Sequence, residues 1–134
     1  MSEETVEVVR RWWGGFNKSG MPPLSLCDER IEIRMPPDFP IRGSFHGHQG
    51  VRDWVDQIWE AFDNVSIEAE EIIDVTHDGE TVFMLLRARG TAHHTRIEID
   101  FPWAAIWTIR DTKLLFAQGY LSRREALEAA GLSQ

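Results

Sequence analysis

Four strand-like segments follow one another in the second half of the chain, with only short stretches between them. They cover residues 66–74, 81–89, 97–110 and 113–120, and the stretch 76–79 (THDG) is typical of a tight turn. Strands joined by tight turns pair antiparallel, because a parallel pair needs a long crossover connection. The chain is therefore predicted to build a mostly antiparallel sheet.

Helices are expected on both sides of this run of strands. Residues 3–17 and 49–62 carry apolar side chains at helical spacing, and a strand over 30–35 lies between them. A short final helix is expected from Ser122, where SRRE is a capping box, to Gly131. This order predicts an α+β fold in which helices cover one face of the sheet.

Length, charge and cysteine content narrow the class of protein. The 134 residues suit one domain with a real core, so residues 1–134 are taken as a single domain. A formal net charge of -8 argues against nucleic-acid binding, because it repels phosphate backbones. No apolar run approaches the ~20 residues of a membrane span, and the first residues do not read as a signal peptide. The single Cys27 excludes an internal disulfide and fits a reducing compartment, so a cytoplasmic location is expected.

Several motifs resemble those of the SnoaL-like family. Residues 47–54 (GHQGVRDW) are similar to the start of that family's long helix, and 106–111 (IWTIRD) to one of its hairpins. Residues 120–132 (YLSRREALEAAGL) look like its closing helix, and 8–13 (VVRRWW) like its first helix. The resemblance spans nearly the whole chain. It implies a nuclear transport factor 2-like cone, in which a curved sheet is wrapped by the N-terminal helices around an apolar pocket, and a homodimer formed through the convex face.

The catalytic residues implied by the resemblance are replaced in this chain. Ketosteroid isomerases of this superfamily use a Tyr and two acids, and the matching positions hold Trp12, Met35 and Ala105. Neither Met nor Ala can transfer a proton. Epoxide hydrolases of the superfamily use an acid that matches the position of Gly119 here. They also use an Arg–Asp pair, and this chain has no acid at the Asp position of that pair. Asp38 would substitute only if its loop folded inward, so whether the chain is an enzyme stays open.

Strand alternation assigns side chains to the two faces of the sheet. The resemblance places Ala105 and Gly119 on the pocket face. Alternation along the strands then places the other odd-numbered residues of these strands, and those of the strand over 81–89, on the same face. The predicted ligand pocket consists of Trp12, Met35, Trp54, Arg87, Arg89, Trp103, Trp107 and Gly119. The opposite face is also apolar, with no helix left to cover it, which indicates a partner subunit. The predicted homodimer interface contains Met84, Leu86, Ala104 and Ile106.

Three functions stay open. The first is a pocket protein for an apolar or aromatic small molecule with a polar or anionic head, which Arg87 would bind unless it pairs with an internal acid such as Glu71. The second is a cyclase, isomerase or hydrolase with a non-standard acid/base set, for which His46, His48 and a buried Glu71 of raised pKa are candidates. The third is a dimeric interaction module whose pocket is filled by its own side chains. No histidine spacing resembles a zinc motif, so no metal and no cofactor are expected.

Overall fold

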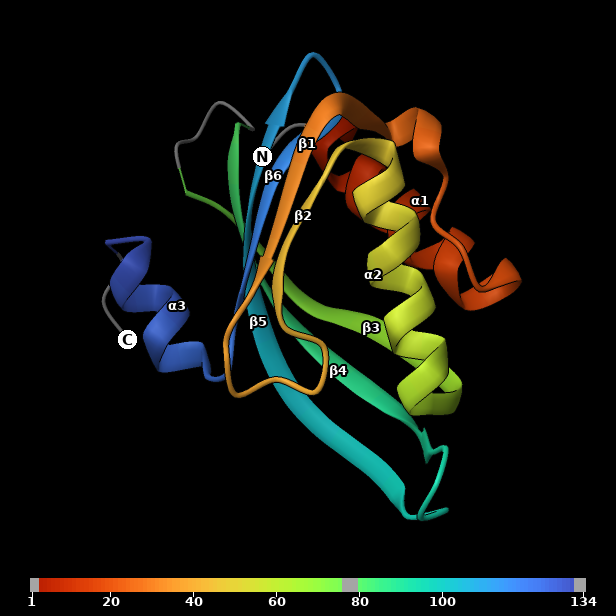
Figure 1. The fold of residues 1–134 in the computed structure, drawn as a ribbon. Helices are drawn as coiled ribbons and strands as arrows, with labels where there is room; N and C mark the ends of the chain where they lie inside the picture. The colour runs from red at the N-terminus through yellow and green to blue at the C-terminus, as the bar shows by residue number, and fades with distance from the viewer. Residues whose placement is uncertain (1–2, 76–79, 132–134) are drawn as a thin grey trace.

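The computed structural model describes residues 3–75 and 80–131 and consists of one sheet with helices on both faces (Figure 1). The elements in chain order are α1 (Glu3–Ser19), a 3-10 turn (Leu24–Leu26), β1 (Cys27–Met35), β2 (Gly43–His46), α2 (Gly47–Ala61), β3 (Phe62–Asp74), β4 (Thr81–Ala92), β5 (Glu98–Arg110), β6 (Lys113–Tyr120) and α3 (Arg123–Ala129). The predicted α+β class is confirmed. The turn predicted at 76–79 lies outside the described residues. Among the helices that are described, none has the length and apolarity needed to cross a membrane.

The strands are ordered β2-β1-β6-β5-β4-β3, and every neighbouring pair is antiparallel except β1 with β6. The run from β3 to β6 is the predicted antiparallel series. β2 was not predicted, because four residues are too few to show alternation. The pairing of β5 with β6 ends at Ala104, so β6 does not extend beside Pro102. The missing N–H of Pro102 therefore removes no hydrogen bond between β5 and β6. β4 and β5 bend along their length, which makes the sheet concave toward α1 and α2 (Figure 1).

The start of α2 is packed closely against the end of β2. α2 buries the stripe predicted from helical spacing, including Val51, Trp54 and Ile58. A Cβ atom added to Gly50 would lie 2.7 Å from the backbone carbonyl carbon of Phe45. Glycine is therefore required at this position, because no side chain fits between the helix and the strand that precedes it.

Most buried side chains form one apolar core between the helices and the concave face. Five of the six tryptophans lie in it, each at most 5% exposed: Trp12, Trp13, Trp54, Trp103 and Trp107. Their ring centroids are 5.7–6.5 Å apart in five pairs. Removing any one of these rings is expected to cost about 3–5 kcal/mol, as for other buried aromatic side chains.

The sequence-based assignment of β4 side chains to the two faces was wrong. The register of β4 with β5 pairs Leu86 with Trp103, so the even-numbered residues of β4 point into the concave core. Two residues predicted for the dimer interface, Met84 and Leu86, are therefore fully buried inside the molecule. Residues 82–86 are all apolar and show no alternation, and a shift of one residue moves every side chain to the other face.

The short helix α3 covers part of the convex face. Ser122 caps it as predicted, since its hydroxyl accepts a hydrogen bond from the Glu125 backbone N–H at 3.1 Å. Two side chains of α3 pack against the fully buried Phe83 and Ala104. The expectation that no helix covers this face was wrong, and Ala104 cannot contact a partner subunit. Of the four predicted interface residues only Ile106 is half-buried on the convex face, and the homodimer itself stays a prediction.

Candidate functional site

An apolar cavity of about 40 Å³ lies between α2, the loop after β1 and the concave face of the sheet. We call it the outer cavity. Every residue that lines it is apolar, and several come from the loop and from the bent halves of the strands, such as Phe39, Phe62, Ala88, Ile99 and Phe101. Phe62 and Ile99 are only half-buried, so the outer cavity lies close to the molecular surface.

A second, deeper cavity of about 20 Å³ lies among the tryptophans. We call it the inner cavity, and the two together are called the chamber. Met35, Trp54 and Trp103 line both cavities and so form the wall between them. Within the described part of the chain, Gln118 is the one polar residue at the inner cavity, and its side-chain N–H donates to the Gly119 carbonyl at 3.1 Å.

Six of the eight predicted pocket residues lie around the inner cavity: Trp12, Met35, Trp54, Trp103, Trp107 and Gly119. Ala105 lies there too, so the positions that the resemblance assigns to proton-transferring groups surround one cavity. Asp38 does not replace them, because it is exposed while its neighbour Phe39 turns inward. The Phe39 ring packs 5.5 Å from that of Trp103. Among the described residues, no acid or histidine lines either cavity.

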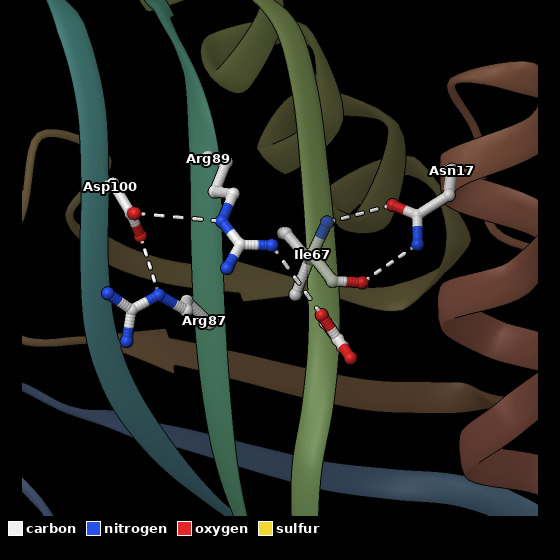
Figure 2. A network of polar contacts seen from close by, with 6 residues as sticks. Asn17, Ile67, Arg87, Arg89 and Asp100 are labelled. Atoms are coloured by element: carbon white, nitrogen blue, oxygen red, sulfur yellow. Dashed lines mark hydrogen bonds and ion pairs between the residues drawn. The ribbon is translucent and has the colours of Figure 1, made fainter.

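Arg87 and Arg89 lie on the convex face, outside the chamber, so their predicted place in the pocket was wrong. The Arg87 Nε–H donates to Asp100 Oδ1 at 2.6 Å, and Arg89 lies 3.6 Å from the other oxygen of Asp100 and 3.7 Å from Glu68 (Figure 2). The hydrogen bond from Arg87 lowers the pKa of Asp100. An ion pair at the surface keeps its hydration, whereas a guanidinium in the apolar chamber would lose it.

The candidate acid/base residues are not assembled into a site. His46 is exposed, and His48 is half-buried with its Nε2 atom 3.1 Å from the Cys27 carbonyl oxygen. Glu71 pairs with Arg123 on the convex side, and hydrogen bonding to that guanidinium lowers the pKa of Glu71. A lowered pKa is the opposite of what was expected for a buried base.

Four indole N–H groups in the core have no hydrogen-bond acceptor within residues 3–75 and 80–131. They belong to Trp12, Trp13, Trp54 and Trp103, all of which line the inner cavity. The sixth tryptophan differs, because the Trp59 N–H donates to the Gly20 carbonyl at 2.9 Å. An unpaired buried donor costs about 1–3 kcal/mol, so the cluster is an unusual feature of this interior.

Sequence reasoning missed two parts of this site. Trp13 was not among the predicted pocket residues, although its helical spacing with Val9 and Phe16 placed it on the buried stripe of α1. Phe39 was missed because it lies in a proline-rich loop, where no periodicity shows which side chain turns inward. The unpartnered state of the indoles has no signal in the sequence at all.

Asn17 fixes α1, and with it the inner tryptophans, to the sheet. Its side-chain amide donates to the Ile67 carbonyl and accepts from the Ile67 N–H, both at 2.8 Å (Figure 2). β3 is an edge strand, so these two backbone groups have no neighbouring strand on that side. The amide takes the place of that strand at one residue.

Comparison with known proteins agrees with the fold. The sequence matches the SnoaL-like domain over residues 7–116. An NTF2-like protein of unknown function from Burkholderia pseudomallei superposes with a TM-score of 0.78 at 17% identity, over 96% of this chain and 97% of that one. TerC, co-crystallised with polyporic acid, superposes with a TM-score of 0.75 at 16% identity, over 96% of this chain and 99% of TerC. A putative SnoaL-like polyketide cyclase from Jannaschia sp. superposes with a TM-score of 0.74 at 13% identity, over 100% of this chain and 98% of the cyclase.

A search of curated proteins finds no match. The domain match covers most of the chain, and the solved structures share its strand-and-helix arrangement from end to end. This chain therefore belongs to the SnoaL-like family and has the nuclear transport factor 2-like fold.

Proposed function

We propose that this chain binds a small apolar or aromatic molecule in the chamber and does not transfer protons to it. The observation that carries the proposal is the lining of the outer cavity, in which every described residue is apolar. The positions that the resemblance assigns to the acids of related enzymes, Met35, Ala105 and Gly119, line the inner cavity next to it. Burial of an apolar ligand there would contribute about 25 cal/mol for each Å² removed from water. TerC, whose crystals contain polyporic acid, and the putative polyketide cyclase support a small organic ligand.

The chamber has to open further to admit such a molecule. Its two cavities of about 40 and 20 Å³ are separated by Met35, Trp54 and Trp103. Met35 is the flexible member of this wall, because its unbranched thioether has three rotatable bonds. It rests over Gly119, where an added Cβ would lie 3.2 Å from its sulfur. Rotation of Met35 would join the two cavities into one space.

The small volumes favour one alternative, an interaction module whose pocket is filled by its own side chains. Calorimetric titration with indane, an apolar bicyclic molecule, separates the two functions. For ligand binding we expect saturable heat with the native chain, tighter binding by Met35→Ala, and loss of binding by Ala88→Phe, which fills the outer cavity. Ile106→Phe places the same phenyl side chain on the convex face, outside both cavities, and serves as the control. Absence of binding by both the native chain and Met35→Ala would favour the filled pocket.

A further inference from the structure

A cleft of about 550 Å³ lies outside the chamber, at the place where two parallel strands end. β1 and β6 pair in parallel up to Arg34 and Gln118, and the two strands end directly afterwards, at Met35 and Tyr120. The chain then continues in two directions, from β1 through a loop into β2 and from β6 into α3 (Figure 1). Chains that diverge at the carboxyl ends of parallel strands leave a crevice, and open sheets of parallel strands bind ligands in such crevices.

We call this crevice the strand-end cleft. Its lining combines apolar surface, to which Pro36 and Pro37 contribute, with the charged side chains of Arg34, Arg42 and Glu125. The three charged residues come from β1, the loop before β2 and α3. Residues that are far apart in the sequence therefore bring both signs of charge to one cleft.

One of the three charges already has a partner. The Arg34 guanidinium pairs with Glu32 and lies 5.4 Å from the centre of the Phe116 ring. Arg42 and Glu125 differ, because within residues 3–75 and 80–131 they form an ion pair neither with each other nor with another residue. Two opposite charges thus line the strand-end cleft without neutralising each other.

The place of Glu125 in α3 shows that its carboxylate is not needed to cap the helix. In a complete capping box this acid accepts a hydrogen bond from the backbone N–H of the cap residue, which is Ser122 here. Only the other half of the box is formed, in which the Ser122 hydroxyl accepts from the Glu125 backbone N–H at 3.1 Å. The carboxylate therefore remains available to a ligand in the cleft.

A ligand that carries both charges fits this arrangement better than a ligand that carries one. An anion would be attracted by Arg42 and repelled by Glu125, and a cation would meet the reverse. A guanidinium binds a carboxylate through two parallel hydrogen bonds, and a carboxylate accepts hydrogen bonds from an ammonium group. We propose that the strand-end cleft binds a small zwitterion of the α-amino acid type, with its carboxylate on Arg42, its ammonium group on Glu125 and an apolar side chain against Pro36 and Pro37.

Three probes that share a phenyl ring test this proposal by calorimetric titration. L-phenylalanine carries both charges, hydrocinnamate carries only the carboxylate, and phenethylamine carries only the ammonium group. We expect the native chain to bind L-phenylalanine about fivefold more tightly than either of the other two. This factor is the upper range for one ion pair at an exposed position, and both Arg42 and Glu125 are exposed.

Substitution of the two charged residues assigns each half of the ligand. Arg42→Gln should weaken L-phenylalanine binding about fivefold, to the level of phenethylamine, and Glu125→Gln should weaken it to the level of hydrocinnamate. Both positions are exposed, and glutamine also suits the capping box, so both variants should fold. Arg52→Gln, at an exposed position of α2 outside the cleft, is the matched control and should keep the native affinity.

The outcomes are independent of the proposed function, because the strand-end cleft lies outside the chamber. Ala88→Phe, which fills the outer cavity, should leave L-phenylalanine binding unchanged, and loss of binding by this variant would overturn the inference. Equal binding of the three probes, or no binding of L-phenylalanine, also overturns it, whatever the result with indane. A preference for L-phenylalanine that survives both Arg42→Gln and Glu125→Gln overturns it as well.

Discussion

Replacing Asn17 with alanine removes a side-chain amide that hydrogen-bonds both backbone groups of Ile67. The two hydrogen bonds are 2.8 Å long and join α1 to the edge strand β3 across 50 residues of sequence. A typical intramolecular hydrogen bond contributes a net ~0.5–1.5 kcal/mol, so the pair is expected to contribute about 1–3 kcal/mol. The exposed position of Asn17 at the edge favours the lower half of this range, because water can replace part of what is lost.

Urea unfolding followed by tryptophan fluorescence measures this effect. Asn17→Ala should lower the free energy of unfolding by about 1–2 kcal/mol without changing the denaturant dependence, since the surface exposed on unfolding is nearly the same. Lys18→Ala, at the next position of α1, which is also exposed, is the matched control and should change stability by less than about 0.5 kcal/mol. Equal stabilities of the two variants would refute the role given to the Asn17 amide.

Four further results are expected. Gly50→Ala should destabilise the fold by about 1–3 kcal/mol in thermal unfolding, because its Cβ would lie 2.7 Å from the Phe45 backbone, and unchanged or raised stability would contradict this packing. Burial raises the pKa of the Cys27 thiol to about 11, so at pH 8 a thiol reagent should react much more slowly with folded than with urea-unfolded protein. Hydrogen bonding to the Arg123 guanidinium lowers the pKa of Glu71 in the folded chain. The ion pair between these residues therefore stabilises the fold above the pKa that Glu71 has in the unfolded chain, and this contribution is lost as pH falls through the lower, folded pKa. A difference in stability between the native chain and Glu71→Gln that is the same at pH 7 and pH 2 would argue against this ion pair. Sedimentation at micromolar concentration should show a homodimer, and monomer alone would remove that prediction.

The parts of the fold that could be predicted are those where residues of two kinds alternate with a clear period. The stripe of α2 was correct because polar residues separate its apolar ones, and the cap of α3 was correct because Ser122 and Glu125 have the spacing of a capping box. The antiparallel run followed from the short turns between strands, which leave no room for crossovers.

The chamber could be predicted only in part. On β5, Trp103 and Trp107 were placed on the correct face, because the resemblance anchored Ala105 to the pocket. On β4 the apolar run 82–86 carries no such anchor, and the wrong face brought Arg87 into the predicted pocket. The face to which a β4 side chain points follows from how β4 pairs with β5, as the hydrogen bond between Arg87 and Asp100 shows. This register is a property of the two strands together, so the sequence of either strand alone does not reveal it.

The response of the six indole N–H groups to a bound ligand tests the chamber most directly. These groups give separate signals in a ¹H–¹⁵N correlation spectrum, and a signal moves when an aromatic ligand binds beside its ring. During titration with indane we expect the signals of Trp54 and Trp103, which line both cavities, to move. The signal of Trp59, whose N–H donates to Gly20 and which lines neither cavity, should stay in place. Signals of Trp54 and Trp103 that do not move at a saturating concentration of indane would contradict ligand binding in the chamber.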